Sequence, residues 1–362
     1  MRILLTADPI GGVWNYALEL CTALRPLHAV IALATLGRPL TRAQRCQLAP
    51  LDHVTVFESA FRLEWMPQPW DDLARAGDWL LDIERRFCPD VIHLNHLVHA
   101  DLPWRAPVVT VGHSCVLSWW NAVRGTPIDG EWSNYRERVT ASLQAASRVI
   151  APTQAMLSCL ESNYGPFRAT AVIHNARNGR IFAPRRKERL VLCAGRLWDE
   201  AKNVAALVAA APHIDGDVVL AGEETGPHGN QVETFDLQLL GQVSTATLVS
   251  WYGRAAIYAL PARYEPFGLT ALEAAWSGCA LVLGDIASLR EVWGPAACYV
   301  SPDDSRGLCE ILNGLLHDDS LRNRMAARAM AQARQFTPAN MAARYRDTYR
   351  QLQCDSCCSI TP

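Results

Sequence analysis

Residues 256–278 read AIYALPARYEPFGLTALEAAWSG, and the fold assignment depends on this stretch. The apolar run AIYAL predicts a buried strand, PARYEPFG predicts a loop, and the remainder predicts a helix over 268–278. Gly278 stands where a glycine commonly follows the end of a helix. A buried strand that leads through a loop into a helix is the repeating unit of a parallel α/β sheet.

Two carboxylates in this stretch need partners. Glu265 lies in the loop and Glu273 lies among apolar helix residues, where an unpaired carboxylate is costly to bury. One interpretation is that both accept hydrogen bonds from a ligand, while the amides of Phe267, Gly268 and Leu269 face a phosphate at the helix N-terminus. The alternative is an ordinary loop Glu265 and a Glu273 that pairs with a nearby arginine.

The same alternation of strand and helix continues along the chain in two series. It predicts an α/β fold with two Rossmann-like, doubly wound domains that face each other across a cleft. The N-terminal domain is expected over 1–175, with 338–362 crossing back to it as a terminal helix. A polar linker is expected over 176–188, and the C-terminal domain over 189–337. Helices are predicted near 12–25, 70–87, 153–163, 203–211, 245–254, 268–278, 303–316 and 318–335.

Composition excludes several classes of protein. The 362 residues include 34 basic and 36 acidic side chains, which gives no electrostatic signature of nucleic-acid binding. No stretch has the length of a membrane span, no signal peptide is evident, and the 12 cysteines look like reduced thiols. We therefore expect a cytoplasmic protein with at most peripheral membrane contact. The group Cys354, Cys357 and Cys358 lacks a second pair of ligands for zinc, and we expect a disordered terminus there.

The residues quoted above resemble a known family, the retaining glycosyltransferases of family 4, which have the GT-B fold. Glu265 through Glu273 is similar to the E-x7-E motif of that family. Four further segments resemble family motifs in the same order along the chain: DPIGGVWNYALEL (8–20), VVTVGHS (108–114), AGRLWDEAKNV (194–204) and GQV (241–243). The resemblance covers nearly the whole chain.

The resemblance implies transfer of a sugar from a nucleotide diphosphate sugar to an acceptor hydroxyl, with retained anomeric configuration and no metal. Arg196 and Lys202 would bind the pyrophosphate, Glu265 the donor-sugar hydroxyls and Glu273 the ribose, while His113 would lie at the reacting region. The sequence itself supports a special role for Lys202, because the chain has only two lysines among its 34 basic residues.

The remaining expectations concern the donor and the acceptor. No cofactor is expected besides the donor substrate, and a UDP-sugar is favoured over a GDP-sugar without a residue that decides between them. The donor is expected to contact Gly11, Gly12, Val243, Phe267, Gly268, Leu269 and Glu273. An aromatic-rich insertion over 115–135 predicts an acceptor surface. The acceptor residues are expected to be Trp14, Asn15, Tyr16, Trp119, Trp120 and Arg124.

Two departures from the family pattern are visible. Ala176 replaces the usual glycine of an Asn-Gly pair, and Ala262 replaces the usual serine before the loop. We expect these changes to affect the hinge and not the charges of the site.

Other functions remain as alternatives. A non-catalytic sugar-nucleotide-binding protein could share the fold, although it would not need to neutralise a leaving group. An NAD-dependent dehydrogenase would need the Gly-x-Gly-x-x-Gly fingerprint, which the glycine loop lacks. His93, His96 and His99 have no nearby carboxylate in the sequence to complete a zinc site, and we expect no metal there.

Overall fold

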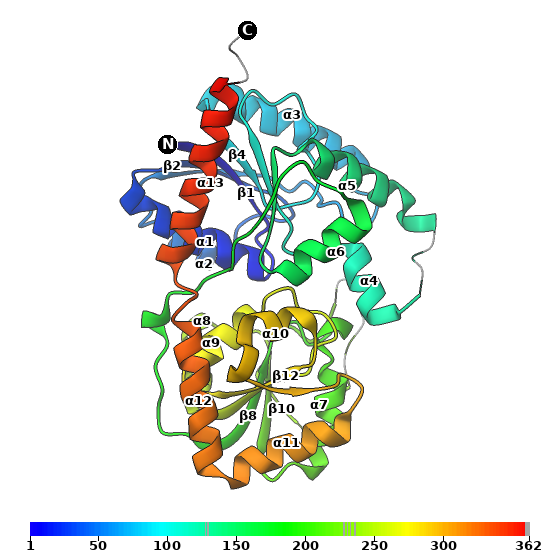
Figure 1. Cartoon of the computed structure of the whole chain (residues 1–362), viewed down its shortest axis with the longest axis vertical. Helices are drawn as coiled ribbons and strands as arrows, with labels where there is room; N and C mark the ends of the chain where they lie inside the picture. Colours follow the sequence, from blue (N-terminus) through cyan, green and yellow to red (C-terminus); the bar gives the residue numbers. More distant parts are fainter. Residues whose placement is uncertain are drawn as a thin grey trace. The chain divides into compact units, whose positions relative to one another are not determined.

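The first sheet is built from strands of the N-terminal part of the chain, all parallel (Figure 1). The computed structural model describes residues 1–358 apart from 127, 129, 227, 228, 230, 232, 235 and 236. Within these residues the strand order is β3-β2-β1-β4-β5-β6-β7. The strands are β1 (Arg2–Ala7), β2 (Val30–Thr35), β3 (Val54–Glu58), β4 (Val91–Leu94), β5 (Val108–Val111), β6 (Arg148–Ala151) and β7 (Thr170–Val172).

The second sheet is also parallel, and its described strands follow the order β10-β9-β8-β11-β12-β13. These strands are β8 (Glu188–Ala194), β9 (Asp217–Ala221), β10 (Gln238–Leu239), β11 (Ala255–Leu260), β12 (Ala280–Gly284) and β13 (Cys298–Val300). Nearly every residue of the central strands is buried, because helices cover parallel sheets on both faces.

Helices follow most strands in both sheets. Beside the first sheet lie α1 (Gly12–Leu24), α2 (Arg42–Leu48), α3 (Trp70–Phe87), α4 (Val116–Arg124), α5 (Ser133–Ala145), α6 (Gln154–Tyr164) and α13 (Pro338–Cys358). Beside the second lie α7 (Val204–Ala210), α8 (Thr245–Arg254), α9 (Leu269–Trp276), α10 (Ala287–Trp293), α11 (Ser305–His317) and α12 (Asp319–Ala333).

Both sheets have the strand order of a doubly wound fold, in which the chain moves outward from the first strand in both directions. The direction reverses between β1 and β4 in the first sheet and between β8 and β11 in the second. Ligands of such sheets bind beyond the carboxyl ends of the strands at this reversal. The fold therefore points to the segments that follow β1 and β4, and to those that follow β8 and β11.

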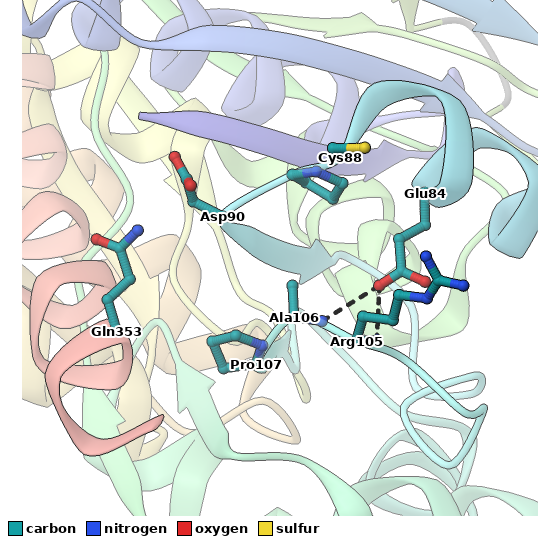
Figure 2. Close-up of a pocket in the computed structure, with 8 residues that line it drawn as sticks. Glu84, Cys88, Asp90, Arg105, Ala106, Pro107 and Gln353 are labelled. Atoms are coloured by element: carbon teal, nitrogen blue, oxygen red, sulfur yellow. Dashed lines mark hydrogen bonds between the residues drawn. The ribbon is translucent and has the colours of Figure 1, made fainter. Parts of the chain in front are cut away.

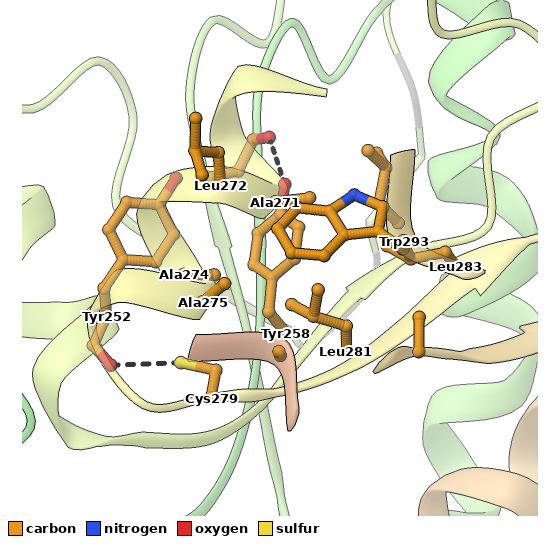
Figure 3. Packing of buried hydrophobic residues seen from close by; sticks show 14 of the residues in the cluster. Tyr252, Tyr258, Ala271, Leu272, Ala274, Ala275, Cys279, Leu281, Leu283 and Trp293 are labelled. Atoms are coloured by element: carbon orange, nitrogen blue, oxygen red, sulfur yellow. Dashed lines mark hydrogen bonds between the residues drawn. The ribbon is translucent and has the colours of Figure 1, made fainter. Parts of the chain in front are cut away.

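The core of the second sheet explains how α9 is held. Ala271, Ala274 and Ala275 give α9 a face of small side chains that packs among Tyr258, Leu281 and Trp293 (Figure 3). All of these residues are fully buried. Small residues let a helix approach a sheet closely, so the position of α9 depends on this packing.

The chain divides into two compact units. Unit 1 contains residues 1–121, 126–175 and 338–362, and unit 2 contains residues 122–125 and 176–337. Residues 176–188, expected as a linker, are grouped with unit 2. Helix α13 belongs to unit 1, which confirms the expected return of the terminal helix.

The expected α/β class with two doubly wound parallel sheets is confirmed, AIYAL forms most of β11, and every predicted helix is present within a few residues of its predicted bounds. Two expectations are wrong. Residues 116–124, expected as part of an irregular insertion, form α4, and the expected disordered terminus at Cys354 instead continues α13 to Cys358. In the described chain no helix is long and apolar enough to cross a membrane.

Candidate functional site

The loop that follows β11 is fixed against the short 3-10 helix η4 (Glu200–Lys202), which lies a few residues beyond β8. The backbone N–H groups of Arg263 and Tyr264 donate to the carbonyl of Ala201 at 2.8 and 3.3 Å. Asn203 adds a second link, because its side chain donates to the carbonyl of Pro261 at 2.9 Å. These bonds bring the segments after β8 and β11 together at the reversal of the sheet.

Lys202 and Glu265 meet where these segments touch. The Lys202 Nζ lies 2.6 Å from the Glu265 Oε2, and their side chains are 15% and 13% exposed. The other carboxylate oxygen, Oε1, accepts the N–H of Gly268 at 3.0 Å and, more distantly, that of Phe267 at 3.4 Å. Glu265 therefore sits between an ammonium group and the positive end of α9.

This arrangement corrects one expectation. The amides of Phe267 and Gly268 were expected to face a ligand, but both point at the Glu265 carboxylate. Leu269 begins α9, and within the described residues its N–H makes no hydrogen bond. The helix N-terminus is thus partly occupied by a side chain of the protein itself.

Arg196 follows β8 and is also paired. Its guanidinium donates to the Asp199 Oδ2 at 2.8 Å, with the Arg196 side chain 44% exposed and that of Asp199 only 4% exposed. The strand end before it is tightly packed, because a Cβ at Gly222 (φ +141°) would lie 1.7 Å from the carbonyl oxygen of Gly195. The glycine at position 222 lets the ends of β8 and β9 approach each other closely.

Tyr258 links the end of β8 to the first turn of α9. Its buried hydroxyl lies 3.1 Å from the carbonyl of Ala194, at the end of β8, and 2.7 Å from the Thr270 Oγ1 in the first turn of α9. Sequence analysis missed this residue, since nothing in the run AIYAL distinguishes its tyrosine from a packing residue.

Glu273 is paired with a residue that sequence analysis did not consider. The Arg177 Nε lies 2.7 Å from the Glu273 Oε1, and each side chain is 7% exposed. The adjoining backbone packs closely as well, because a Cβ at Gly179 would lie 2.7 Å from the Trp276 ring. The structure thus matches the alternative in which Glu273 pairs with a nearby arginine, and its contact with a ribose remains a prediction.

The expectation that the departure at Ala176 affects the hinge and not the charges of the site stays a prediction. The neighbour of Ala176, Arg177, neutralises Glu273.

Val243, expected near the nucleobase, lies partly exposed between β10 and α8. Nearby, the carbonyl of Gly241 accepts the N–H of Gly222 at 2.9 Å, which holds this segment beside the end of β9. Val243 is thus placed on the same edge of the sheet as Arg196 and Lys202.

In unit 1, Gly11 and Gly12 lie at the carboxyl end of β1 and are both exposed. Gly11 has φ +74°, and a Cβ there would meet no heavy atom within 4 Å. The glycine is required by the backbone conformation, and the space beside it is open. This geometry permits close approach of a ligand to the backbone.

His113 lies two residues beyond β5 and is partly exposed. Its Nε2 lies 2.9 Å from the Asn95 Oδ1, and its ring contacts that of Tyr16 at 4.4 Å between centroids. Burial lowers the pKa of His113 to about 3, so the imidazole is neutral at physiological pH.

The three acceptor residues expected beside the glycine loop do not lie on a common exposed surface. They are Trp14, Asn15 and Tyr16. Tyr16 is fully buried and Trp14 is 4% exposed, with its Nε1 donating to Gln47 at 2.8 Å. Both side chains are part of the core, which disfavours their assignment to the acceptor, and that assignment stays a prediction. Asn15 is partly exposed and keeps its expected place.

The aromatic segment forms a helix. Trp119 and Trp120 are partly exposed on α4, and Arg124 is exposed at the last residue of that helix. An acceptor role for them is untested.

His96 and His99 in unit 1 take part in a chain of hydrogen bonds. The His96 Nδ1 lies 3.0 Å from the Thr6 Oγ1, its Nε2 lies 2.8 Å from the His99 Nδ1, and the His99 Nε2 lies 2.8 Å from the carbonyl of Leu73. Each ring nitrogen thus has a protein partner. In the part of the chain that the structure describes, no three His, Cys, Asp or Glu side chains are grouped as metal ligands.

A cavity of about 340 Å³ lies at the opposite edge of the first sheet, where β4 and β5 begin (Figure 2). Glu84 lies in its wall, and one of its carboxylate oxygens accepts the N–H groups of Arg105 and Ala106 at 2.8 and 3.2 Å. Because these are the amino ends of the strands, the cavity is distinct from the candidate site.

Comparison with known proteins gives two family matches. Residues 10–178 match the family described as Glycosyltransferase Family 4, and residues 188–318 match Glycosyl transferases group 1.

Individual relatives agree with these matches. A glycogen synthase of Mycobacterium tuberculosis is 32% identical over 366 residues, with 88% of this chain and 86% of that protein covered. A phosphatidyl-myo-inositol mannosyltransferase of Mycolicibacterium smegmatis is 31% identical over 183 residues, which is 46% of each chain. O-antigen chain mannosyltransferase B of Escherichia coli is 34% identical over 32% of this chain and 30% of its own. The chain spans less than half the length of these two mannosyltransferases.

Solved structures share the fold. Sucrose-phosphate synthase from Thermosynechococcus elongatus aligns with a TM-score of 0.80 at 19% identity, over 98% of this chain and 100% of that one. Anabaena Alr3699/HepE in complex with UDP and glucose aligns with a TM-score of 0.76 at 19% identity, over 97% and 100%. Together with the family matches, these results show that the chain belongs to family 4 of the glycosyltransferases and has the GT-B fold.

Proposed function

We propose that the protein transfers a sugar from a nucleotide diphosphate sugar to an acceptor hydroxyl, with retention of configuration and without a metal. The observation that carries this proposal is the meeting of Lys202 and Glu265 at the strand reversal of unit 2, with Arg196 on the same edge of the sheet. Ligands of doubly wound sheets bind at this place.

Lys202 and Arg196 can both bind the pyrophosphate of the donor. Lys202 has three N–H donors and uses one on Glu265, so the ammonium can also meet a phosphate oxygen. Arg196 has five N–H donors and a side chain that is 44% exposed. Two fixed cations at a pyrophosphate stabilise the charge that develops on the leaving phosphate, which is electrostatic catalysis.

Glu265 is proposed to hold hydroxyls of the donor sugar. A carboxylate offers about four lone-pair sites, and three contacts here leave capacity for a hydroxyl. No second positioned nucleophile is proposed, and the departing phosphate takes the proton of the acceptor on the same face of the sugar. Glu273, already neutralised by Arg177, is proposed to accept from the ribose through its remaining lone pairs.

The donor is proposed to be a UDP-sugar. The support is the fold shared with Anabaena Alr3699/HepE, whose structure was solved in complex with UDP and glucose. The acceptor is a saccharide, a glycolipid or a small molecule with a free hydroxyl.

A thermal-shift series with UDP, GDP and their sugars, run in EDTA, tests the proposal. A ligand that binds the folded state raises the melting temperature by mass action. We expect stabilisation by a nucleotide diphosphate sugar in EDTA, and the Arg196→Ala variant should lose it. Stabilisation that requires added Mg²⁺ or Mn²⁺ would contradict the metal-free site.

A further inference from the structure

Asn95 lies just after β4 and contacts two histidines at once. Its Oδ1 lies 2.9 Å from the Nε2 of His113 and 3.1 Å from the Nε2 of His93. Asn95 is 7% exposed and His93 is fully buried. Contacts between buried polar groups must match donors with acceptors, so this cluster constrains where each proton lies.

The orientation of the Asn95 amide is fixed by its other contact. Its Nδ2 lies 2.7 Å from the carbonyl oxygen of Thr6, which can only accept a hydrogen bond. The amide oxygen therefore faces both imidazoles, and each imidazole must present an N–H to it. Both His93 and His113 thus carry their proton on Nε2.

The contact at the other ring nitrogen of His93, Nδ1, agrees with a proton on Nε2. With the proton on Nε2, the Nδ1 of His93 is an acceptor, and the hydroxyl of Tyr349 on α13 lies 2.6 Å from it. Tyr349 is fully buried and can donate its O–H to that nitrogen. The Tyr16 hydroxyl also lies 3.3 Å from the His93 Nε2 and can accept from the same N–H, so each contact of His93 has a donor and an acceptor.

We propose that Asn95, held by Thr6, His93 and Tyr349, fixes the tautomer of His113 so that its Nδ1 presents a lone pair at the carboxyl edge of the first sheet. In the described part of the chain the Nδ1 of His113 makes no hydrogen bond. A neutral nitrogen with a lone pair accepts from a hydroxyl group and cannot donate to a phosphate oxygen. What this nitrogen meets rests on the proposed function, whereas the tautomer does not.

Asn95, His93 and Tyr349 act here as positioning residues, since they reach the surface only through His113. Outer groups that fix an imidazole's tautomer in this way are known to decide its chemistry. The terminal helix α13 thereby contributes to the state of a histidine at the carboxyl edge of unit 1.

Long-range proton–nitrogen NMR correlation spectra of the full, ligand-free chain test the proposal, with His113→Gln to identify the signals. We expect a single tautomer of His113 with its proton on Nε2. Because burial lowers the pKa of His113 to about 3, this pattern should persist down to about pH 5. A proton on Nδ1, or a mixture of tautomers in the unaltered protein, would overturn the proposal without any variant being needed.

Variants separate positioning from packing. Asn95→Ala should convert His113 to a mixture of tautomers, and Tyr349→Phe should shift the His93 signals first and those of His113 less. Tyr345→Phe is the comparison on the same helix, because Tyr345 is a buried residue of α13 whose hydroxyl lies near Tyr16 and forms no hydrogen bond with Asn95, His93 or His113. If His113 keeps a pure Nε2–H tautomer in Asn95→Ala, Asn95 does not fix it. If the tautomer is as expected but no nucleotide sugar is turned over, the proposed function fails and this inference stands.

Discussion

The Lys202 Nζ lies 2.6 Å from the Glu265 Oε2, so two residues expected to bind different parts of one donor are bonded to each other in the ligand-free protein. The pair is partly shielded from water and is held by the backbone bonds of Arg263 and Tyr264 to Ala201. These contacts hold the Lys202 ammonium in a fixed position beside Glu265. Preorganised charge of this kind costs no rearrangement at the moment of reaction.

Removal of a cation should reduce turnover more than stability. We expect Lys202→Ala and Arg196→Ala each to lower kcat by about 10²–10³-fold, the usual effect of losing one group that stabilises transition-state charge. Lys202→Arg should recover only part of the rate, because a guanidinium does not replace a compact ammonium. Steady-state kinetics of donor hydrolysis and transfer, with circular dichroism to check folding, measure these effects.

The other lysine is the matched control. Lys187 donates to the carbonyls of Tyr252 and Ser277 at 3.2 and 2.7 Å, away from the candidate site. Lys187→Ala should lower the free energy of unfolding and leave the kcat of the folded protein close to the original. Near-normal turnover in Lys202→Ala would remove that residue from the proposed mechanism.

The buried pair of Arg177 and Glu273 should matter chiefly for stability. Arg177→Met leaves the Glu273 carboxylate buried without its partner, which typically costs about 3–5 kcal/mol. The double variant Arg177→Met/Glu273→Gln should recover part of that loss. Urea unfolding, followed by tryptophan fluorescence, measures the free energies.

Arg306→Met serves as the comparison, because Arg306 and Glu310 form an exposed pair with side chains 90% and 65% accessible. That substitution should change the free energy of unfolding little. If Arg177→Met and Arg306→Met lowered the free energy of unfolding equally, the buried pair would stabilise the fold no more than the exposed pair does.

Glu64 should make unit 1 sensitive to pH. The residue is 5% exposed, and burial raises the pKa of its carboxyl above the ordinary value of 4.5. The charged form is thus disfavoured in the folded state, and this cost is present at high pH and vanishes below about pH 4.5. Glu64→Gln should therefore raise the melting temperature at pH 8, with the gain shrinking as the pH falls toward 4.5.

Thermal unfolding across this pH range measures the effect. The amide oxygen of a glutamine can still accept the N–H of Leu97, which lies 3.0 Å from the Glu64 Oε1. Glu161→Gln, at an exposed position, is the control and should change nothing. A gain for Glu64→Gln that does not depend on pH would contradict the argument from ionisation.

The acceptor assignment of α4 predicts a selective kinetic effect. Trp119→Ala and Trp120→Ala should raise the acceptor KM several-fold or change acceptor preference, since these side chains are partly exposed aromatic surface. Donor affinity by titration calorimetry should stay close to that of the unaltered protein. Trp65→Ala, at a side chain that is 37% exposed in another loop, is the control. Equal weakening of donor and acceptor would show that α4 contributes packing or donor contact instead.

The sequence predicts the fold well because burial on both faces leaves a direct pattern in parallel strands. AIYAL and RLVLCAG are apolar at nearly every position, and both are central strands of the second sheet. Burial of α1 on more than one side explains one error. Trp14 and Tyr16 lie on different sides of the helix and are both buried, whereas Asn15 between them is partly exposed.

The site is only partly predictable, because its pairs join residues far apart in the chain. Sequence motifs identify Lys202 and Glu265 singly, but the bond between them depends on how β8 and β11 lie side by side. Arg177 and Glu273 are separated in the same way, and no local pattern indicates that they meet. The sequence predicts which residues lie at the carboxyl edge of the sheet, but it does not predict which of their side chains pair with one another.

The stereochemistry of slow donor hydrolysis tests the central claim most directly. The purified protein is incubated in EDTA with a panel of α-linked UDP- and GDP-sugars, and proton NMR follows the anomer of the released sugar before it equilibrates. We predict that the α anomer appears first, that Lys202→Ala lowers the rate of its release by about 10²–10³-fold, and that EDTA has no effect. Initial release of the β anomer, or no release from any donor in the panel, would contradict the central claim.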